Sequence, residues 1–213
     1  TDNSGNQAND GCGSASLSND GHYVAFVSRA DNLVADDTNE ERDIFVKDLQ
    51  SGAITRASTS SSGNQAIGGN SYSPNVSADG QYVAFRSDAD NLVSGDTNNS
   101  WNVYVKNWQT GDIVMADTDA AGNHSNNDAY GTPSLSFDGR YVAFASDASN
   151  LVARNPGTWI DIFVKDLQTG AVVVLNTDLS GNEANDTSGT PSISSDGKYV
   201  AFWSLASDLI ADD

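Results

Sequence analysis

The sequence predicts an all-β fold, a β-propeller built from four-stranded antiparallel blades. Two observations predict it. No segment keeps an apolar period of 3.6 residues, because Gly, Asn, Asp and Ser interrupt the chain every few residues. The chain also repeats itself, which is typical of repeat architectures. We expect one propeller segment over residues 1–213, with three complete copies at 1–58, 59–117 and 118–176 and a truncated copy at 177–213, beginning at Thr1, Thr59, Thr118 and Thr177.

The most regular block of each copy predicts a β-hairpin. It reads LSNDGHYVAFVS, VSADGQYVAFRS, LSFDGRYVAFAS and ISSDGKYVAFWS in the four copies. An Asp-Gly pair between two short runs rich in β-branched and aromatic residues is a hairpin signal. In the second copy we therefore expect a first strand at about Ser73 to Ser77 and a second strand at Tyr82 to Ser87.

A second block predicts another pair of strands. It reads RDIFVKDLQSG, WNVYVKNWQTG and IDIFVKDLQTG, followed by AITRAS, DIVMAD and AVVVLN. Each run is a strand, a turn that contains Gly, and a strand. In the second copy these strands are expected at Asn102 to Trp108 and Asp112 to Asp117. The fourth copy ends after its second strand, so the sequence supplies three and a half blades.

The apolar pattern within the strands favours a propeller. The runs Tyr-Val-Ala-Phe and Ile-Phe-Val are apolar at successive positions, which indicates that both faces of each sheet are covered. Four-stranded sheets that stack face to face at a fixed repeat length are typical of propellers. A β-solenoid is the structural alternative, although its repeats are usually shorter.

The strings PSxSxDGxYVAFxS and DIFVKDLxTG resemble the WD40-like PD40 repeats of the TolB-like propeller family, over essentially the whole chain. The resemblance implies a bacterial, exported propeller of about six to eight blades. With only three and a half blades, the chain is expected either to be part of a longer array or to be completed by another chain. Otherwise the open edge of the last blade would be an aggregation hazard.

Composition restricts the partners and the location. Ten basic and 29 acidic residues give a net charge of -19, which repels nucleic acids and anionic lipids across most of the surface. No apolar stretch could insert into a membrane, and no signal peptide follows Thr1, so an export signal is expected to have been removed. We expect a secreted, cell-surface or periplasmic protein. The single Cys12 cannot form an intrachain disulfide, and His22 and His124 alone do not make a zinc site.

The loops between the second and third strands suggest calcium. Oxygen-bearing side chains fall at alternate positions in the first copy, a spacing found in loops that wrap a calcium ion. The second copy has a weaker set, and the third barely any. The alternative is that these residues only form turns, through bonds to local backbone groups. The candidate ligands are Asp37, Asn39, Glu41 and Asp43 in the first copy, and Asp96 and Asn98 in the second.

Aromatic and amide side chains on the long loops are candidates for binding a ligand. Aromatic faces beside Asn and Asp suit stacking and hydrogen bonding to sugars, but aromatics at strand starts also fill gaps between blades. A Gly-Asn pair occurs in every copy and either forms a turn with positive φ or lines a polar site. The candidates are Trp101, Trp159, Tyr72, Tyr130, Asn64 and Asn123.

No catalytic motif is recognisable, so we expect no enzymatic activity. The long connections between second and third strands, and between successive copies, lie on one rim of a propeller, where binding residues tend to collect. The sequence therefore predicts a non-catalytic extracellular binding or adhesion module that recognises a protein or glycan through this rim. The alternative is a structural or assembly segment of a larger exported protein, which self-associates or is completed through its open blade edge.

Overall fold

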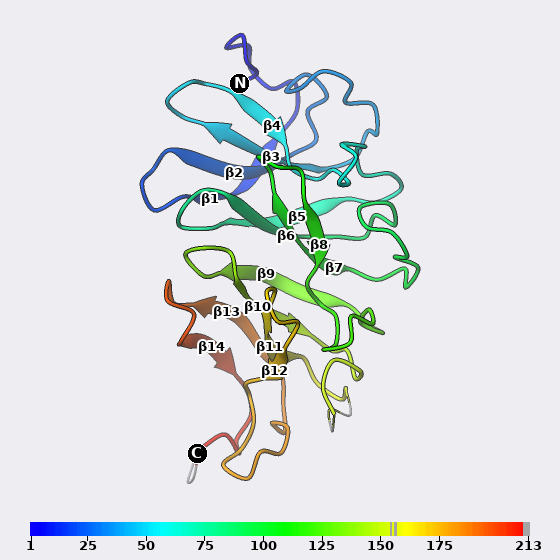
Figure 1. The fold of residues 1–213 in the computed structure, drawn as a ribbon, viewed down its shortest axis with the longest axis vertical. Helices are drawn as coiled ribbons and strands as arrows, with labels where there is room; N and C mark the ends of the chain where they lie inside the picture. The colour runs from blue at the N-terminus through cyan, green and yellow to red at the C-terminus, as the bar shows by residue number, and fades with distance from the viewer. Residues whose placement is uncertain (154, 156, 211–213) are drawn as a thin grey trace.

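A computed structural model describes residues 1–153, 155 and 157–210 of the chain. Within these residues every regular element is a β-strand, and the strands form four antiparallel sheets. The sheets are stacked along the long axis of the molecule, and the two ends of the chain lie at opposite ends of the stack (Figure 1). The structure confirms the predicted all-β, incomplete propeller of three and a half blades. The described part of the chain has no helix with the length and hydropathy needed to cross a membrane.

We letter the strands of each blade A to D in chain order. The second strand of blade 2 lies where the sequence predicts it, whereas the first begins two residues earlier and the fourth is shorter. The bounds are β1 (Cys12–Leu17), β2 (Tyr23–Ser28), β3 (Asp43–Asp48) and β4 (Ile54–Arg56) in blade 1; β5 (Ser71–Val76), β6 (Tyr82–Ser87), β7 (Asn102–Asn107) and β8 (Ile113–Met115) in blade 2; β9 (Ala129–Leu135), β10 (Tyr141–Ser146), β11 (Asp161–Asp166) and β12 (Val172–Val174) in blade 3; and β13 (Ser188–Ile193) and β14 (Val200–Ser204) in the half-blade.

A bulge in strand A explains why β5 begins earlier than predicted. Its pairing with β6 shifts between Tyr72 and Asn75, so the strand continues on both sides of an irregular step. At this step Ser73 has a φ of 55°, a left-handed conformation, and the next residue is Pro74, which cannot donate a hydrogen bond to the ladder. All four strands A contain such a shift, and in blade 3 the left-handed residue is Gly131.

Strands B and C form the buried centre of each complete blade. Their pairing is unbroken over six residues in all three blades. An aromatic residue of strand B stacks on one of strand C in each blade: Phe26 on Phe45, Phe85 on Tyr104, and Phe144 on Phe163, with ring centroids 5.6–5.8 Å apart. Two hydrophobic clusters lie between blades 1 and 2 and between blades 2 and 3. Both faces of blade 2 are therefore covered, as its apolar strands predict.

Strands A connect one blade to the next. A polar side chain in strand A of each complete blade accepts a hydrogen bond from a backbone N–H in strand A of the following blade. Val76 N donates to Ser16 Oγ over 3.2 Å, and Leu135 N donates to Asn75 Oδ1 over 2.9 Å. Ile193 of the half-blade repeats this bond to the strand A of blade 3. These bonds fix the register between neighbouring blades.

A lysine near the end of strand C holds the loop that precedes its own blade. Lys106 Nζ donates to the carbonyls of Thr59, Ser60 and Gly111 over 2.7–2.9 Å. Lys47 and Lys165 contact the corresponding loop carbonyls in blades 1 and 3. Desolvation lowers the pKa of Lys106 and Lys165, but neutral carbonyls surround both ammonium groups, which remain hydrogen-bonded.

Candidate functional site

The long loops collect on one side of the stack. In Figure 1 the A–B hairpin turns point to the left, and the B–C loops and the connections from blade 1 to blade 2 and from blade 2 to blade 3 lie to the right. The candidate calcium ligands and most of the candidate binding residues lie on these connections or at the strand ends next to them.

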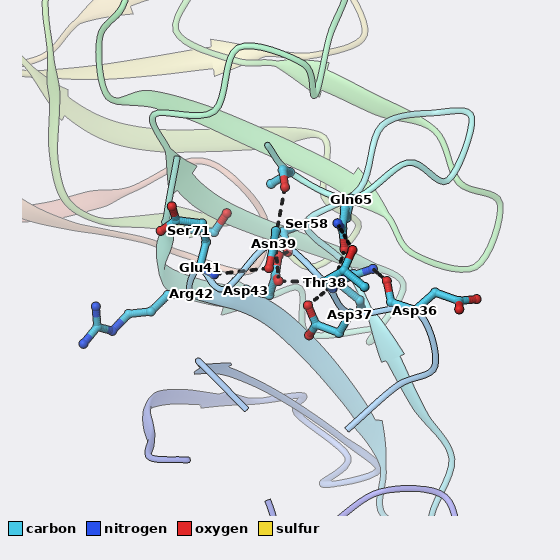
Figure 2. A network of polar contacts seen from close by, with 12 residues as sticks. Asp36, Asp37, Thr38, Asn39, Glu41, Arg42, Asp43, Ser58, Gln65 and Ser71 are labelled. Carbon is cyan, nitrogen blue, oxygen red and sulfur yellow. Dashed lines mark hydrogen bonds and ion pairs between the residues drawn. The ribbon is translucent and has the colours of Figure 1, made fainter. Parts of the chain in front are cut away.

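The candidate calcium ligands of blade 1 surround an arginine. Arg56 Nη1 lies 2.8 Å from Asp37 Oδ1 and 3.5 Å from Asp43 Oδ2, and all three side chains are buried. Asn39 turns its amide nitrogen toward Asp43 and donates a hydrogen bond to Oδ2 over 3.0 Å (Figure 2). Glu41 contributes its backbone N–H, which donates to Asn39 Oδ1. The positive charge between the two carboxylates therefore comes from Arg56.

These residues do not fit a calcium site in the arrangement that the structure shows. Calcium takes six to eight oxygen ligands, whereas Asn39 presents a nitrogen and Arg56 lies against both carboxylates. Burial raises the pKa of Asp37 and Asp43, which further weakens them as ligands. In the described ranges, no group of three or more His, Cys, Asp or Glu side chains could hold a metal ion. Calcium binding stays a prediction, and it would require Arg56 to move away.

The corresponding residues of blade 2 form a polar cluster without a cation. The Tyr104 hydroxyl donates a hydrogen bond to Asp96, and Asn98 exchanges amide hydrogen bonds with Asn102 over 2.8 and 3.0 Å. Asp117, two residues after strand D, accepts hydrogen bonds from Val103 N and the Ser125 hydroxyl. Asp117 is fully buried, and burial raises its pKa to about 7.

Blade 3 has a third version of this cluster. Asp161 accepts hydrogen bonds from the amides of Asn155 and Asn176, over 3.0 and 2.6 Å. Burial, and a hydrogen bond shared with Asp161, raise the pKa of Glu183 to about 7. We call these sets the polar clusters of the blades: Asp37, Asn39, Asp43, Arg56 and Ser58 in blade 1; Asp96, Asn98, Asn102, Asp117 and Ser125 in blade 2; and Asn155, Asp161, Asn176 and Glu183 in blade 3.

The polar clusters share one backbone contact. In each blade the side chain that follows strand D accepts the N–H of the second residue of strand C: Ser58 from Ile44, Asp117 from Val103, and Asn176 from Ile162, over 2.8–3.0 Å. Spacing within the B–C loop cannot reveal these partners, because they lie just after strand D. The sequence signal that could have revealed them is the polar residue at this position of every copy.

Two of the candidate aromatic residues lie together. The rings of Tyr72 and Trp101 are 5.6 Å apart. The Arg42 guanidinium lies 5.6 Å from the Tyr72 ring centre and donates to its hydroxyl over 3.1 Å, and Arg86 lies 5.4 Å from the Trp101 ring centre. We call Arg42, Tyr72, Trp101 and Arg86 the aromatic row. It runs from the B–C loop of blade 1 to the sheet of blade 2.

Blade 3 continues this row with other contacts. Arg86 Nη1 donates to the Ala129 carbonyl over 2.6 Å, which places the neighbouring Tyr130 close by. The Tyr130 hydroxyl donates to Asp147, and burial together with this bond raises the Tyr130 pKa to about 12. Within the described residues, Arg86 Nε and Asp147 Oδ1 are buried without a hydrogen-bond partner.

Trp159 is not the counterpart of Trp101. Trp101 immediately precedes Asn102, the first residue of β7, whereas Trp159 lies two residues before Asp161, the first residue of β11. Its side chain is 39% exposed, and in the part of the chain that the structure describes no ring or guanidinium stacks on it. The structure therefore does not bring the two tryptophans to one site.

The two candidate asparagines form turns in the loops between blades. The backbone and amide nitrogens of Asn123 donate to the Asp119 carboxylate over 2.8 and 2.7 Å, and Gly122 before it has a φ of 87°. Asn64 closes the matching turn through its backbone N–H, which donates to Ser60 Oγ. Asn64 also lines an open hollow of about 450 Å³ with residues of the B–C loop, which include Asp90 and Asn91.

No family model and no curated protein matches the sequence. Solved structures do match the fold. TolB from Acinetobacter baumannii is 18% identical with a TM-score of 0.53 over 91% of this chain, and a prolyl endopeptidase is 19% identical with a TM-score of 0.55 over 92%. An oligogalacturonate lyase from Vibrio parahaemolyticus is 15% identical with a TM-score of 0.53 over 96%.

The chain spans 37% of the TolB chain, 26% of the endopeptidase and 50% of the lyase. Its likeness to them is one of fold, and it agrees with the blade motifs in the sequence. The chain is therefore an incomplete β-propeller that is similar to TolB-like propellers.

Proposed function

We propose that the chain is a non-catalytic binding module of an exported bacterial protein and that it recognises an acidic glycan through the aromatic row. The observation that carries the proposal is the stacking of Arg42 and Arg86 on Tyr72 and Trp101. Only 10 of the 213 residues are basic. Two of them lie on adjacent aromatic rings at the long-loop rim, so the row is a local basic site on a chain whose net charge of -19 repels anions elsewhere.

The row offers the two contacts that an acidic sugar needs. Aromatic faces stack on the apolar C–H surface of a sugar ring, and a guanidinium binds a carboxylate through parallel hydrogen bonds. Arg42 is exposed and lies at one end of the row, whereas Arg86 is partly buried and already donates to a backbone carbonyl. Arg42 is therefore the residue that would meet the carboxylate, and Trp101 the one that would stack.

A glycan array that includes uronic-acid oligomers tests the proposal. Trp101→Ala should weaken binding about tenfold or more, the loss expected for one aromatic contact. Trp159→Ala is the matched control, because Trp159 is exposed on the corresponding loop but lies outside the row, and it should bind as the wild type does. An array without a hit, or equal losses in both variants, would refute recognition through the row; an acidic protein as the only ligand would reassign the row to a protein partner.

A second function is favoured by the free edge of β14. In the described chain this strand pairs only with β13, whereas its counterparts in the complete blades also pair with a strand C. Tyr199, Trp203 and Leu205 beside this edge are 73%, 48% and 66% exposed. An unpaired edge with apolar neighbours is a template for another strand. The alternative function is a structural or assembly segment whose open blade is completed by another chain or a second copy.

Sedimentation over a wide concentration range tests this alternative. Self-association should appear at micromolar concentration and should be abolished by Trp203→Lys, which places a charge beside the edge. Leu49→Lys is the control, because Leu49 is comparably exposed in blade 1. A monomer at every concentration would exclude the second copy as the completing chain.

A further inference from the structure

The two complete junctions between blades differ most in size at the residue that follows strand C. In blade 2 this residue is Trp108, and its indole enters the junction with blade 1. The indole lies 5.2 Å from the ring of Tyr23, and Nε1 donates a 2.7 Å hydrogen bond to the carbonyl of Gly80. In blade 3 the corresponding residue is Leu167.

The surroundings of these two residues share a tyrosine and a hairpin glycine, although Ala53 stands at the first junction where the second has Asp112. A Cβ on Gly80 would lie 2.3 Å from the Tyr23 ring, and a Cβ on Gly139 would lie 2.5 Å from the ring of Tyr82. Each junction therefore has a tyrosine of one blade pressed against the hairpin glycine of the next. Leu167 is smaller than an indole and lacks the N–H, and within the described residues no hydrogen bond reaches the Gly139 carbonyl.

A pocket of about 430 Å³ lies in the junction that lacks the tryptophan. This size is within the range of small-molecule sites. It opens on the side of the hairpin turns, opposite the long loops on which the sequence placed the binding residues. The residues that matter for the chemistry are Tyr82, Val105, Asp112, Asp138, Gly139 and Leu167.

The pocket has apolar walls and an acidic mouth. Asp112 and Asp138 are exposed carboxylates at its edge. The one arginine in the lining, Arg140, is held by Asp166 through two hydrogen bonds of 3.1 and 2.7 Å and lies over the ring of Tyr141. Its charge is thus neutralised by a carboxylate outside the lining. Asp112 accepts a hydrogen bond from the Thr110 hydroxyl, and Asp138 accepts two, from the Ser136 hydroxyl and the Arg140 N–H. Within the described residues neither carboxylate forms an ion pair, so both can still face a cation.

We propose that this pocket binds an indole ring that carries a positive charge beside it. The ring lies between Tyr82 and Leu167, its N–H donates to the Gly139 carbonyl, and the ammonium or guanidinium group lies next to Asp112 and Asp138. Trp108 supports this assignment, because it shows that the same backbone and tyrosine accept an indole in the neighbouring junction. The ligand is either a free indolylalkylamine or a tryptophan next to a basic residue in a partner peptide.

Fluorine NMR of 5-fluorotryptamine with the full chain tests the proposal. The resonance should broaden with the wild type, and Leu167→Trp should reduce this broadening at least tenfold, because the new indole fills the pocket. Trp108→Leu should instead add a second, weaker site, since it opens the matching space between blades 1 and 2, where Ala53 replaces Asp112. A resonance that stays sharp with the wild type, or one that Leu167→Trp leaves equally broad, would overturn the proposal.

Charge variants and ligand analogues complete the test. Asp112→Asn with Asp138→Asn should weaken tryptamine several-fold and leave neutral indole unchanged, and indole-3-acetate should bind more weakly than either. Both aspartates are exposed, so these substitutions are not expected to unfold the chain. Equal binding of tryptamine and indole-3-acetate would overturn the role of the carboxylates. Tighter binding of a Lys-Trp peptide than of tryptamine identifies a partner protein as the source, and the reverse order identifies a free amine.

Discussion

The polar clusters of blades 1 and 2 occupy the same place and balance their charges differently. In blade 1 Arg56 lies against two carboxylates, Asp37 and Asp43. In blade 2 the residue at the position of Arg56 is Met115, and the carboxylates are Asp96, bound to a tyrosine hydroxyl, and the buried Asp117. Both clusters accept the same backbone N–H of strand C. The fold thus requires a hydrogen-bond acceptor at this point; the buried carboxylates of blade 1 face an arginine, whereas burial raises the pKa of Asp117 in blade 2.

Arg56→Met should be the most damaging change. It gives blade 1 the methionine of blade 2, but not the Tyr104 hydroxyl that binds Asp96 there. It leaves Asp37 and Asp43 buried without their cation, so we expect a loss of about 3 kcal/mol in the free energy of unfolding, measured by urea denaturation. Arg29→Met is the control, because Arg29 is exposed and makes one backbone contact, and it should cost less than about 0.5 kcal/mol. A loss below 1 kcal/mol for Arg56→Met would mean that protonation can replace the arginine in blade 1 as well.

The same variant sharpens the calcium prediction. With Arg56 absent, the two carboxylates would be free to bind a cation. Millimolar calcium should therefore raise the melting temperature of Arg56→Met more than that of the wild type, relative to chelator. A larger effect in the wild type would show that calcium binds elsewhere, and no effect in either protein would exclude this loop as a calcium site.

Blades 2 and 3 should make the protein more stable in mild acid. The pKa of Asp117 is raised from 3.8 to about 7 in the folded chain. Between these two values the folded state binds a proton that the unfolded state lacks, so stability falls as the pH rises from about 4 to about 7, by at most about 1.4 kcal/mol per pH unit for this group, and levels off above 7. Glu183, with a pKa raised to about 7, acts in the same direction.

Asp117→Asn separates the contribution of blade 2 from that of blade 3. An asparagine keeps the acceptor for Val103 N, as Asn176 does in blade 3, and cannot ionise. The variant should be less sensitive to pH between about 4 and 7 in urea unfolding, and more stable than the wild type at pH 8. An unchanged pH profile would assign the effect to Glu183 or to the net charge of the whole chain.

The bulge in strand A should give blades 2 and 3 a smaller difference in their contribution to the free energy of unfolding. Ser73 holds a left-handed φ that costs a non-glycine residue about 1 kcal/mol, whereas blade 3 has Gly131 in this conformation. Ser73→Gly should raise the free energy of unfolding by only about 0.5 kcal/mol, because the relief of backbone strain is partly offset by the freedom that glycine gains in the unfolded chain. Gly131→Ala is the reciprocal change and should lower it by about 1 kcal/mol. A loss of stability in Ser73→Gly would show that the serine side chain contributes more than its backbone costs.

The strands were predictable because their signals are local. The Tyr-Val-Ala-Phe run and the Asp-Gly turn define strand B to the residue, and β6 lies at Tyr82–Ser87 as expected. The bulge was not predictable from alternation, since it depends on how strand A meets its neighbour. Strand D is shorter than expected, because only three of its residues pair with strand C.

The site was less predictable because its contacts join distant positions. Alternate carboxylates in a loop look like metal ligands until Arg56, from strand D, lies between them. A shift of one residue relative to strand C separates Trp159 from Trp101, although both precede this strand in the sequence. A comparison of the copies position by position would have shown both differences between the blades, since Met115 stands at the position of Arg56 and Ile160 at the position of Trp101.

The contacts of Lys47, Lys106 and Lys165 also say where one repeat ends and the next begins. Each lysine binds the loop that precedes its own blade, so this loop and the four strands after it form one structural unit. Removing residues 59–117 as a block would join β4 to the loop that Lys165 already holds, whereas a cut inside a loop would leave a lysine without its carbonyls. The array can therefore be shortened or lengthened by whole blades while every ammonium keeps its partners.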